Sequence, residues 1–328
     1  LYSKANFNAG DNERPSLEII NSKFISNNAT HSGGAIHVGY RMYAIMKDIL
    51  INKNTAVYEG GGIFFDRSFF EELDGDENDG TFSNDQIYNL TITNNHAGNW
   101  GGGIYFSTIR SFEFNAGIKK CVIANNSALG TTVWNDSTMN NGGGIYLTGS
   151  YMVIDSSVVS DNIGGGIFSD WYFQLNLTNS SVVNNTGGGI MITENQANWP
   201  SITTPRILKS TITNNSEYGI LGNFDYVNDS NIMSNVFGIN LNGTTYLPAT
   251  NNFWGHSTGP QHPTQNPSGQ GDSVSTFVNV DPWLTTPNTD APPITAQNTT
   301  VTGTGNDFIS LNWDASLIAS NARPKQQK

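Results

Sequence analysis

The chain has 328 residues and carries 15 Lys and Arg against 27 Asp and Glu, which gives a formal net charge of −12 at pH 7. Such an acidic surface repels nucleic acids and anionic membranes, and no apolar run is long enough to cross a bilayer. We therefore expect neither nucleic acid binding nor membrane insertion. The only cysteine, Cys121, cannot form an intrachain disulfide and is followed by the apolar pair Val122 and Ile123, so we expect a packed thiol.

A short phrase recurs along the chain: an apolar residue, an Asn three positions later, a glycine run and a closing Ile. Two clear copies end as Gly101-Gly102-Gly103-Ile104 and Gly142-Gly143-Gly144-Ile145. The closing residues are Ile36, Ile63, Ile104, Ile145, Ile167, Ile190, Ile220 and Ile239. The Asn residues are Asn28, Asn54, Asn95, Asn126, Asn162, Asn185, Asn215 and Asn235. The shortest intervals between closing Ile residues are 22, 23 and 19 residues, which predicts one solenoid coil per phrase.

The composition of the phrase favours strands over helices. Segments 90–93 and 211–213 are β-branched, alternate polar with apolar residues, and are bounded by Asn and Gly. A repeat of about 20 residues built from short strands and turns is typical of a parallel β-helix, here an all-β solenoid of about nine coils. In stacked coils the Ile residues form a continuous core, and the Asn side chains can hydrogen-bond in a ladder.

The phrase resembles the repeats of right-handed parallel β-helices of the pectin-lyase-like superfold, in the variety found in secreted and surface bacterial proteins. The resemblance covers roughly residues 17–284. The segment Asn251-Asn252-Phe253-Trp254-Gly255, followed by Asp281-Pro282-Trp283-Leu284, resembles the closing coil and cap of such modules. The resemblance implies a β-helix over residues 1–284 with a cap at about 249–284, and an extracellular or cell-surface location.

Two intervals of 41 residues, which end at Ile104 and at Ile145, contain insertions on the basic coil. The first insertion is rich in oxygen donors, which suit a hard cation such as calcium. These donors are Asp74, Asp76, Asn78 and Asp79. Their spacing does not match an EF-hand, and a solvated acidic loop is the alternative. We expect no other cofactor.

Strand alternation predicts a further row of residues on the outside of the β-helix. If each closing Ile points into the core, the next residue points outward. These outward residues are mostly aromatic or apolar: His37, Phe64, Tyr105, Tyr146, Phe168, Met191 and Leu221. Such a stripe usually marks a contact. Either insertions cover it and make it a second core, or sugar rings or another subunit pack on it.

Enzymes are common on this superfold, and glycoside hydrolysis needs two carboxylates about 5 to 9.5 Å apart. Asp66 and Asp170 occupy the same outward position three coils apart, at about 14 Å. Asp155, Asp161 and Asp170 fall within one coil and remain the candidates for a catalytic site. The paired Asp motifs of polygalacturonases are absent, as is a lyase-type Lys or Arg base with clustered calcium ligands.

The C-terminal region changes in character after Leu284. Residues 285–297 are rich in Thr and Pro and predict a linker. Residues 301–314 alternate like a strand and resemble the opening strands of a fibronectin type III sandwich. Such a sandwich needs about 100 residues, so segment 298–328 is either an incomplete domain or a donor strand that completes another sheet.

Three functions are compatible with this pattern. The first is a noncatalytic scaffold or adhesin module of a larger secreted or surface protein, in contact with glycans along one face. The second is assembly with copies of itself into fibres, because solenoid ends have unpaired strand edges. The third is a polysaccharide lyase or glycoside hydrolase. We favour the noncatalytic module, with glycans, other copies of the chain or further domains of the same polypeptide as partners.

Overall fold

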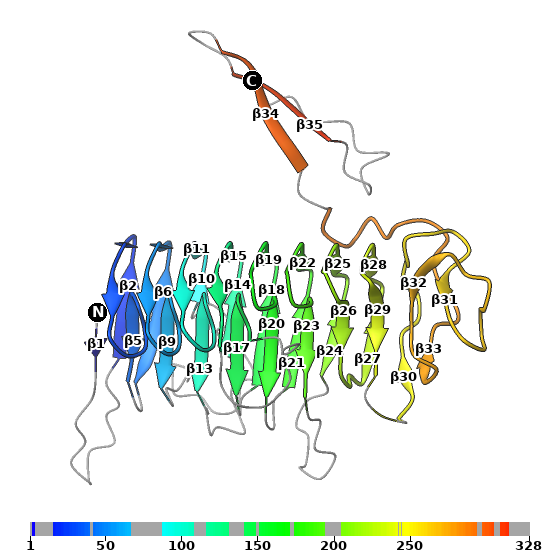
Figure 1. The fold of residues 1–328 in the computed structure, drawn as a ribbon, viewed down its shortest axis with the longest axis horizontal. Coiled ribbons are helices and arrows are strands. Elements are labelled where there is room, and N and C mark those ends of the chain that lie inside the picture. Colours follow the sequence, from blue (N-terminus) through cyan, green and yellow to red (C-terminus); the bar gives the residue numbers. More distant parts are fainter. Residues whose placement is uncertain are drawn as a thin grey trace, which may run out of the picture.

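The computed structural model describes residues 2–3, 16–39, 42–66, 87–107, 116–130, 141–148, 151–170, 174–193, 205–241, 243, 245–293, 297–304 and 309–314. Most of these residues form a right-handed parallel β-helix whose coils stack along the long axis in Figure 1. The predicted all-β solenoid is confirmed. None of the described residues belongs to a helix that could span a membrane.

Each coil contributes a strand to three long parallel sheets, which we call A, B and C. Sheet A contains β1 (Tyr2–Ser3), β5 (Ile36–Val38), β9 (Ile63–Asp66), β13 (Ile104–Ser107), β17 (Ile145–Thr148), β20 (Ile167–Asp170), β23 (Ile190–Ile192), β26 (Tyr218–Leu221) and β29 (Phe237–Asn240). Sheet B contains β2 (Ser16–Ile20), β6 (Tyr43–Lys47), β10 (Ile87–Tyr88), β14 (Ala116–Lys119), β18 (Tyr151–Asp155), β21 (Gln174–Thr178), β24 (Arg206–Leu208) and β27 (Tyr226–Asn228). Sheet C contains β3 (Lys23–Ile25), β7 (Leu50–Asn52), β11 (Thr91–Thr93), β15 (Val122–Ala124), β19 (Val158–Ser160), β22 (Ser181–Val183), β25 (Thr211–Thr213) and β28 (Asn231–Met233).

Shorter strands complete the fold. A four-stranded sheet follows sheet C in the first coils and contains β4 (Asn28–Ala29), β8 (Thr55–Ala56), β12 (His96–Ala97) and β16 (Ser127–Ala128). The C-terminal cap contains the pairs β30 (Leu247–Pro248) with β33 (Val278–Asn279), and β31 (Pro260–Gln261) with β32 (Gly271–Ser273). An antiparallel hairpin of β34 (Gln297–Thr304) and β35 (Ile309–Asp314) ends the described chain.

The closing Ile residues build the core. Ile63, Ile104 and Ile145 are fully buried and pair in register from coil to coil. Two residues further along sheet A, Phe65 and Phe106 also point inward, and their ring centroids lie 4.5 Å apart in a stacked arrangement. Because every coil repeats this placement, burial of apolar surface stabilises the β-helix along its whole axis.

The glycine run has two separate physical causes. Gly101 has a φ of +64°, which disfavours any residue with a Cβ. At Gly102 the constraint is space, since a Cβ there would lie 2.4 Å from the Ser127 carbonyl oxygen and 2.5 Å from that of Gly143. The glycine run therefore has a structural role: the chain turns at Gly101, and the backbones of adjacent coils come into contact at Gly102.

An asparagine ladder runs through the inside of the turn after sheet C. Asn95 donates from its backbone N–H and from Nδ2 to Oδ1 of Asn126, both at 2.9 Å. Asn126 repeats the pattern with Asn162, and the same contacts continue to Asn235. The left-handed conformation belongs to the residue before each ladder Asn, such as Asn94 with a φ of 56°.

The predicted first member of this ladder, Asn28, is wrong by one residue. Asn27 donates to Oδ1 of Asn54 from its backbone N–H and from Nδ2, whereas Asn28 lies in β4 with an exposed side chain. The register pairs Phe24 with Ile51, so Phe24 takes the inward position and Ile25 is 48% exposed. Two adjacent Asn residues and two adjacent apolar residues allowed either alignment in the sequence.

A second ladder, which the sequence analysis did not predict, runs along the turn before sheet C. The backbone N–H of Cys121 donates to Oγ of Ser157, and Ser157, Ser180 and Ser210 each donate in turn to the next coil. Cys121 takes the same place with its thiol, because its Sγ accepts the Leu90 N–H at 3.4 Å. Burial raises the pKa of the Cys121 thiol to about 11, so it is a packed neutral group, as expected.

The cap closes both ladders. Asn252 accepts the Ser230 N–H and ends the serine ladder, while Asp272 accepts from Asn235 and ends the asparagine ladder. Trp254 is fully buried and belongs to the same hydrophobic core as the closing Ile residues. Cap residues therefore cover the open end of the core and supply acceptors for its last donors.

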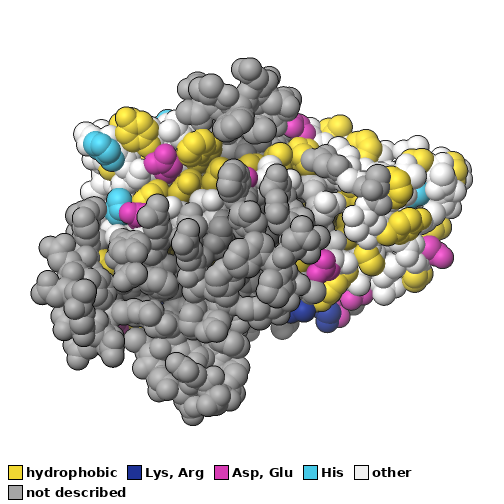
Figure 2. All heavy atoms as spheres, turned by 90° about the horizontal axis from the view of Figure 1, so that it is seen from below, with side chains coloured by type: hydrophobic (Ala, Val, Ile, Leu, Met, Phe, Trp, Pro, Cys, Tyr) yellow, Lys and Arg dark blue, Asp and Glu magenta, His cyan; other side chains and the backbone are white. Residues whose placement is uncertain are grey.

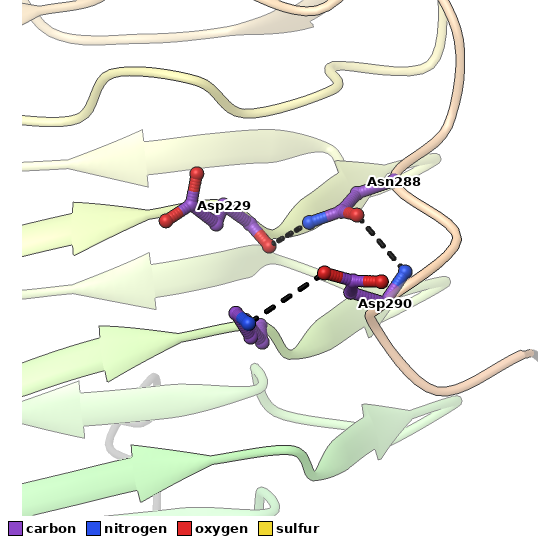
Figure 3. A network of polar contacts seen from close by, with 4 residues as sticks. Asp229, Asn288 and Asp290 are labelled. Carbon is purple, nitrogen blue, oxygen red and sulfur yellow. Dashed lines mark hydrogen bonds and ion pairs between the residues drawn. The ribbon is translucent and has the colours of Figure 1, made fainter.

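Residues 285–293 of the predicted linker lie against the β-helix. Asn288 and Asn231 exchange two hydrogen bonds, between Asn231 Nδ2 and the Asn288 carbonyl and between the Asn288 N–H and Asn231 Oδ1. Asn288 also donates from Nδ2 to the Asp229 carbonyl, and Asp290 pairs with Lys209 at 3.5 Å (Figure 3). We call residues 285–293 the strap.

Residues 294–296 are outside the described part of the chain, and the hairpin β34–β35 alone does not establish a fibronectin type III domain.

Candidate functional site

The outer face of sheet A carries two parallel rows of side chains. The first row follows each closing Ile, and strand register pairs its members in the order His37, Phe64, Tyr105, Tyr146, Phe168, Met191 and Leu221. The second row lies two residues further along the strands and is polar: Asp66, Ser107, Thr148, Asp170 and Thr193. Members of a row are separated by one strand spacing, about 4.8 Å.

The N-terminal part of the first row is partly exposed. The ring of Phe64 lies between those of His37 and Tyr105, with centroid distances of 4.8 and 5.2 Å. Phe64 and Tyr105 are nearly parallel, with an interplanar angle of 11°. We call His37, Phe64 and Tyr105 the open aromatic row. Figure 2 shows hydrophobic side chains in a band, with histidine and acidic side chains beside it near the N-terminal end of the view.

The middle of the first row is a second core. Tyr146, Phe168 and Met191 are 4–8% exposed and pack with Trp100, which precedes the glycine run of the third coil, and with Tyr218 and Phe237, the first residues of β26 and β29. The Tyr218 ring lies so close to Gly188 that a Cβ on Gly188 would be 2.4 Å from it. The stripe is thus buried at Tyr146, Phe168 and Met191 and partly exposed at its N-terminal members and at Leu221, while its role as a contact surface stays a prediction.

Three carboxylates flank the first row. Glu59 precedes the glycine run of the second coil and accepts a hydrogen bond from Ser32 at 2.5 Å. Asp66 and Asp170 belong to the polar row on the other side. Burial raises the pKa of Tyr105 above its ordinary value, and the charges of Glu59, Asp170 and Asp66 add to that rise. The tyrosine hydroxyls of this face therefore remain protonated hydrogen-bond donors at neutral pH.

Asp170 and His37 mark the two ends of this surface. Asp170 accepts from Tyr146 Oη at 3.3 Å and from Thr193 Oγ1 at 2.9 Å, so its carboxylate is held against the rows. Burial lowers the pKa of His37 below its ordinary value, while a hydrogen bond to the Ser32 backbone and the charge of Asp66 act in the opposite direction. Glu59 was not among the predicted site residues, although its position next to a glycine run was a usable signal.

The three candidate catalytic carboxylates are not brought together. Asp155 ends a strand of sheet B, Asp161 lies in the turn after sheet C, and Asp170 ends a strand of sheet A. Asp155 accepts from Thr178 and Asn179, and Asp161 accepts from Asn184, as parts of polar contacts between turns. Their proximity in sequence therefore does not place them in one site.

The predicted calcium donors Asp74, Asp76, Asn78 and Asp79 fall outside the described residues. Among the described residues, no group of three or more His, Cys, Asp or Glu side chains is placed to hold a metal ion.

A family model described as periplasmic copper-binding protein (NosD) matches residues 73–266, which is more than half of the 328 residues. The chain belongs to the NosD family. The match extends from the first insertion into the cap and agrees with the β-helix. No curated protein and no solved structure matched the chain.

Membership of the NosD family corrects the expected cofactor. We expected none, with calcium as the one candidate, whereas the family is described by copper. The family description also places the NosD protein in the periplasm, which agrees with the expected location in the coarse sense of a compartment outside the cytoplasm.

Several of the described His, Cys and Met side chains carry donor atoms of the kind that copper binds. Copper takes imidazole, thiolate and thioether donors. Cys121 is committed to the serine ladder, and His96 contacts Ser127 while His262 accepts backbone N–H groups in the cap. Met191 contacts the Tyr218 hydroxyl at 3.4 Å. Within the described ranges these donors are dispersed over the β-helix and do not fit a copper centre, so we assign no ligands.

Proposed function

We propose that this protein is a noncatalytic β-helix, located outside the cytoplasm, that binds carbohydrate along the outer face of sheet A. The observation that carries the proposal is the open aromatic row, His37, Phe64 and Tyr105, with a polar row directly beside it. The faces of these rings are stacked on one another, so a sugar would pack its C–H groups against the partly exposed ring edges, and its hydroxyls need hydrogen-bonding partners beside them. The two rows offer both kinds of contact along one line.

The regular spacing of the rows favours an extended ligand. Each coil repeats the same pair of positions at about 4.8 Å, so a chain that lies along the β-helix axis meets similar contacts at successive steps. The buried part of the first row, Tyr146, Phe168 and Met191, fixes the rings beside it and limits their freedom. Rings that are already fixed lose little conformational entropy when a ligand binds.

The alternative function is that of a lyase or glycoside hydrolase that acts on a polysaccharide at the same face. Asp155 and Asp161 belong to sheet B and to the turn after sheet C, and Asp66 and Asp170 lie three strands apart on sheet A, at about 14 Å. Hydrolysis needs carboxylates within about 5 to 9.5 Å. The arrangement of these four residues favours binding without cleavage.

The experiment screens the full chain against neutral, acidic and amino-sugar polysaccharides. Retention and reducing-end release are measured for the wild type, for Phe64→Ala and for Tyr88→Ala, a control that removes an aromatic ring from sheet B. We expect binding that Phe64→Ala weakens and Tyr88→Ala does not, without new reducing ends. Cleavage that is lost on Asp170→Asn would support the enzyme instead, and no binding to any polysaccharide would refute the proposal.

Self-assembly into fibres and a role in adhesion are finer versions of this proposal. Among the described residues, β2, β3 and β4 are edge strands at the N-terminal end, which supports assembly, as does the hairpin β34–β35. Negative-stain images and size-exclusion chromatography at rising concentration test it. Single rods at every concentration would refute the fibre version.

Copper binding is a second candidate function, favoured by the family description. The test is the copper content of the full chain after equilibration with Cu(I) and with Cu(II) and removal of free metal. One tightly held ion per chain would support a copper site, to be located by substitution of individual His and Met residues. No retained copper in either oxidation state would refute this candidate.

A further inference from the structure

Electron-rich rings surround Tyr146 in the first row. The Tyr146 ring stacks on that of Tyr105, with centroids 5.0 Å apart and an interplanar angle of 13°. The Trp100 ring lies 5.6 Å from that of Tyr146. Phenol and indole are the protein rings that lose a single electron most easily, and rings in contact exchange electrons without a mobile carrier. Because Trp100 and Tyr105 are partly exposed, they connect the buried Tyr146 ring with the surface.

The hydroxyl of Tyr146 has a proton acceptor. Tyr146 Oη donates to Asp170 Oδ2 at 3.3 Å, and Thr193 Oγ1 donates to the other oxygen, Oδ1, at 2.9 Å. The carboxylate is therefore held between the two hydroxyls. Burial raises the pKa of Tyr146 above its ordinary value, and the charge of Asp170 adds to that rise, so the resting phenol is neutral. A phenol that loses an electron becomes a much stronger acid than a carboxylic acid, and its proton then passes to Asp170.

We infer that Tyr146 is a redox-active tyrosine that holds one oxidising equivalent as a neutral tyrosyl radical. A strong one-electron oxidant, such as a peroxyl radical, takes an electron from Trp100 or Tyr105, and Tyr146 returns an electron to that ring. The Tyr146 O–H bond breaks, its proton bonds to Asp170 Oδ2, and one electron of the bond stays on the oxygen. The net products are a reduced oxidant, a tyrosyl radical and a neutral carboxyl group. This activity is independent of carbohydrate binding.

Burial protects such a radical. Tyr146 is 6% exposed and packs with Phe168 and Met191, so reductants in water and radicals on other chains do not reach its ring. Tyr88 on sheet B has the opposite environment, because the Lys120 ammonium donates to its hydroxyl and lies 5.2 Å from its ring centroid. A cation beside the ring opposes the loss of an electron. Tyr88 is therefore the matched control.

The test oxidises the full chain with photogenerated tris(bipyridine)ruthenium(III), which removes one electron and accepts no proton. Transient absorption and electron paramagnetic resonance then follow the tyrosyl radical. We expect a long-lived radical in the wild type and in Tyr88→Phe, and its loss in Tyr146→Phe. Phenylalanine keeps the ring in the second core, and thermal unfolding verifies the fold of each variant.

A second variant tests the proton acceptor. Asp170→Asn keeps an oxygen beside the Tyr146 hydroxyl but cannot take up its proton, so the proton must pass to a base in solution. We expect the radical to form more slowly by about tenfold or more, at a rate that rises with the concentration of buffer base. The wild-type rate should not depend on buffer base. Asp161→Asn, in the turn after sheet C, should behave as the wild type.

Three outcomes would overturn the inference. A long-lived radical that persists in Tyr146→Phe would belong to another residue. Equal rates and equal buffer dependence in the wild type and in folded Asp170→Asn would show that Asp170 does not take the proton. A wild-type radical that decays as fast as that of N-acetyltyrosinamide would show that the second core does not protect it. Each of these results leaves the proposed carbohydrate binding untouched.

Discussion

The carboxylate of Asp272 accepts the last two hydrogen bonds of the asparagine ladder. Its Oδ2 lies 3.0 Å from the backbone nitrogen of Asn235 and 2.9 Å from Asn235 Nδ2. The residues are 37 positions apart, and Asp272 belongs to β32 of the cap. Burial raises the pKa of Asp272 to about 6, although the hydrogen bonds from Asn235 act to lower it. The cap therefore ends the ladder with a group that titrates in the acidic range.

Asp272 makes stability depend on pH. Because its pKa is raised above the unfolded value near 4, the folded state binds the proton more tightly, so stability falls as pH rises from about 4 to about 6. The difference amounts to at most about 3 kcal/mol. Asp272→Asn keeps an oxygen acceptor for Asn235 and should remove this part of the slope. Urea unfolding of both proteins between pH 4 and 8 measures it, and identical slopes would contradict the role of Asp272.

An interior member of the asparagine ladder should matter more than its predicted first member. Asn126→Ala removes the acceptor for two Asn95 donors and the donor to the Ile92 carbonyl, all in a buried turn. We expect a loss of about 2 to 4 kcal/mol of unfolding free energy, because the buried partners remain unsatisfied. Asn28→Ala, at the exposed position, should cost less than about 0.5 kcal/mol. Comparable losses for the two variants, by denaturant unfolding, would restore the original assignment.

Cys121 should tolerate serine and resist thiol reagents. The next coils have serine at the equivalent position, at Ser157 and Ser180, where the hydroxyl oxygen accepts a backbone N–H. In Cys121→Ser the hydroxyl would accept the Leu90 N–H, which Cys121 Sγ accepts in the wild type. Cys121→Ser should shift the unfolding free energy by less than about 1 kcal/mol, whereas Cys121→Ala leaves the Leu90 N–H unpaired and should cost about 1 to 3 kcal/mol. Native protein should react slowly with a thiol reagent at pH 8. Rapid labelling, or equal stability of both variants, would contradict the ladder role.

The hydrogen bonds of Asn288 should hold the strap on the β-helix more strongly than the ion pair of Asp290 does. Asn288→Ala removes the Nδ2 donor to the Asp229 carbonyl and the Oδ1 acceptor of the Asp290 N–H, as drawn in Figure 3. It should weaken the strap by about 1 to 2 kcal/mol, measured by limited proteolysis after Leu284. Asp290→Ala should change cleavage little, since the side chains of Lys209 and Asp290 are 48% and 68% exposed. Faster cleavage of Asp290→Ala than of Asn288→Ala would refute this ranking.

The repeat made the fold and the aromatic row predictable, because the closing Ile fixes the register and alternation then fixes the outward residues. The same counting failed by one residue at Asn28, where neighbouring Asn residues gave no preference. The serine ladder was visible as a constant offset of five residues, from Ser157 to Asn162 and from Ser210 to Asn215. It was missed because Cys121 and Asn252 take the place of serine at its two ends. Asp272 could not be found in this way, since only the folded cap brings it to Asn235.

The site was harder to predict than the coil. The sequence could not show which part of the row is covered, because Trp100, Tyr218 and Phe237 reach it from positions before the closing Ile, where the repeat does not fix the direction of the side chain. It also grouped Asp155 with Asp170 by their proximity in the chain, whereas one coil distributes neighbouring residues over three faces. In a solenoid, spatial neighbours are one coil apart, and those pairs are the ones to examine.

The most direct test of the central claim is the affinity of Phe64→Ala for the oligosaccharide that the wild type binds best. Phe64 lies between His37 and Tyr105, and its side chain points away from the core, so its loss should leave the unfolding temperature nearly unchanged. Titration calorimetry should show affinity reduced by about tenfold or more, as expected when an aromatic contact with the ligand is lost. Unchanged affinity in the folded variant would show that the outer face of sheet A is not where carbohydrate binds.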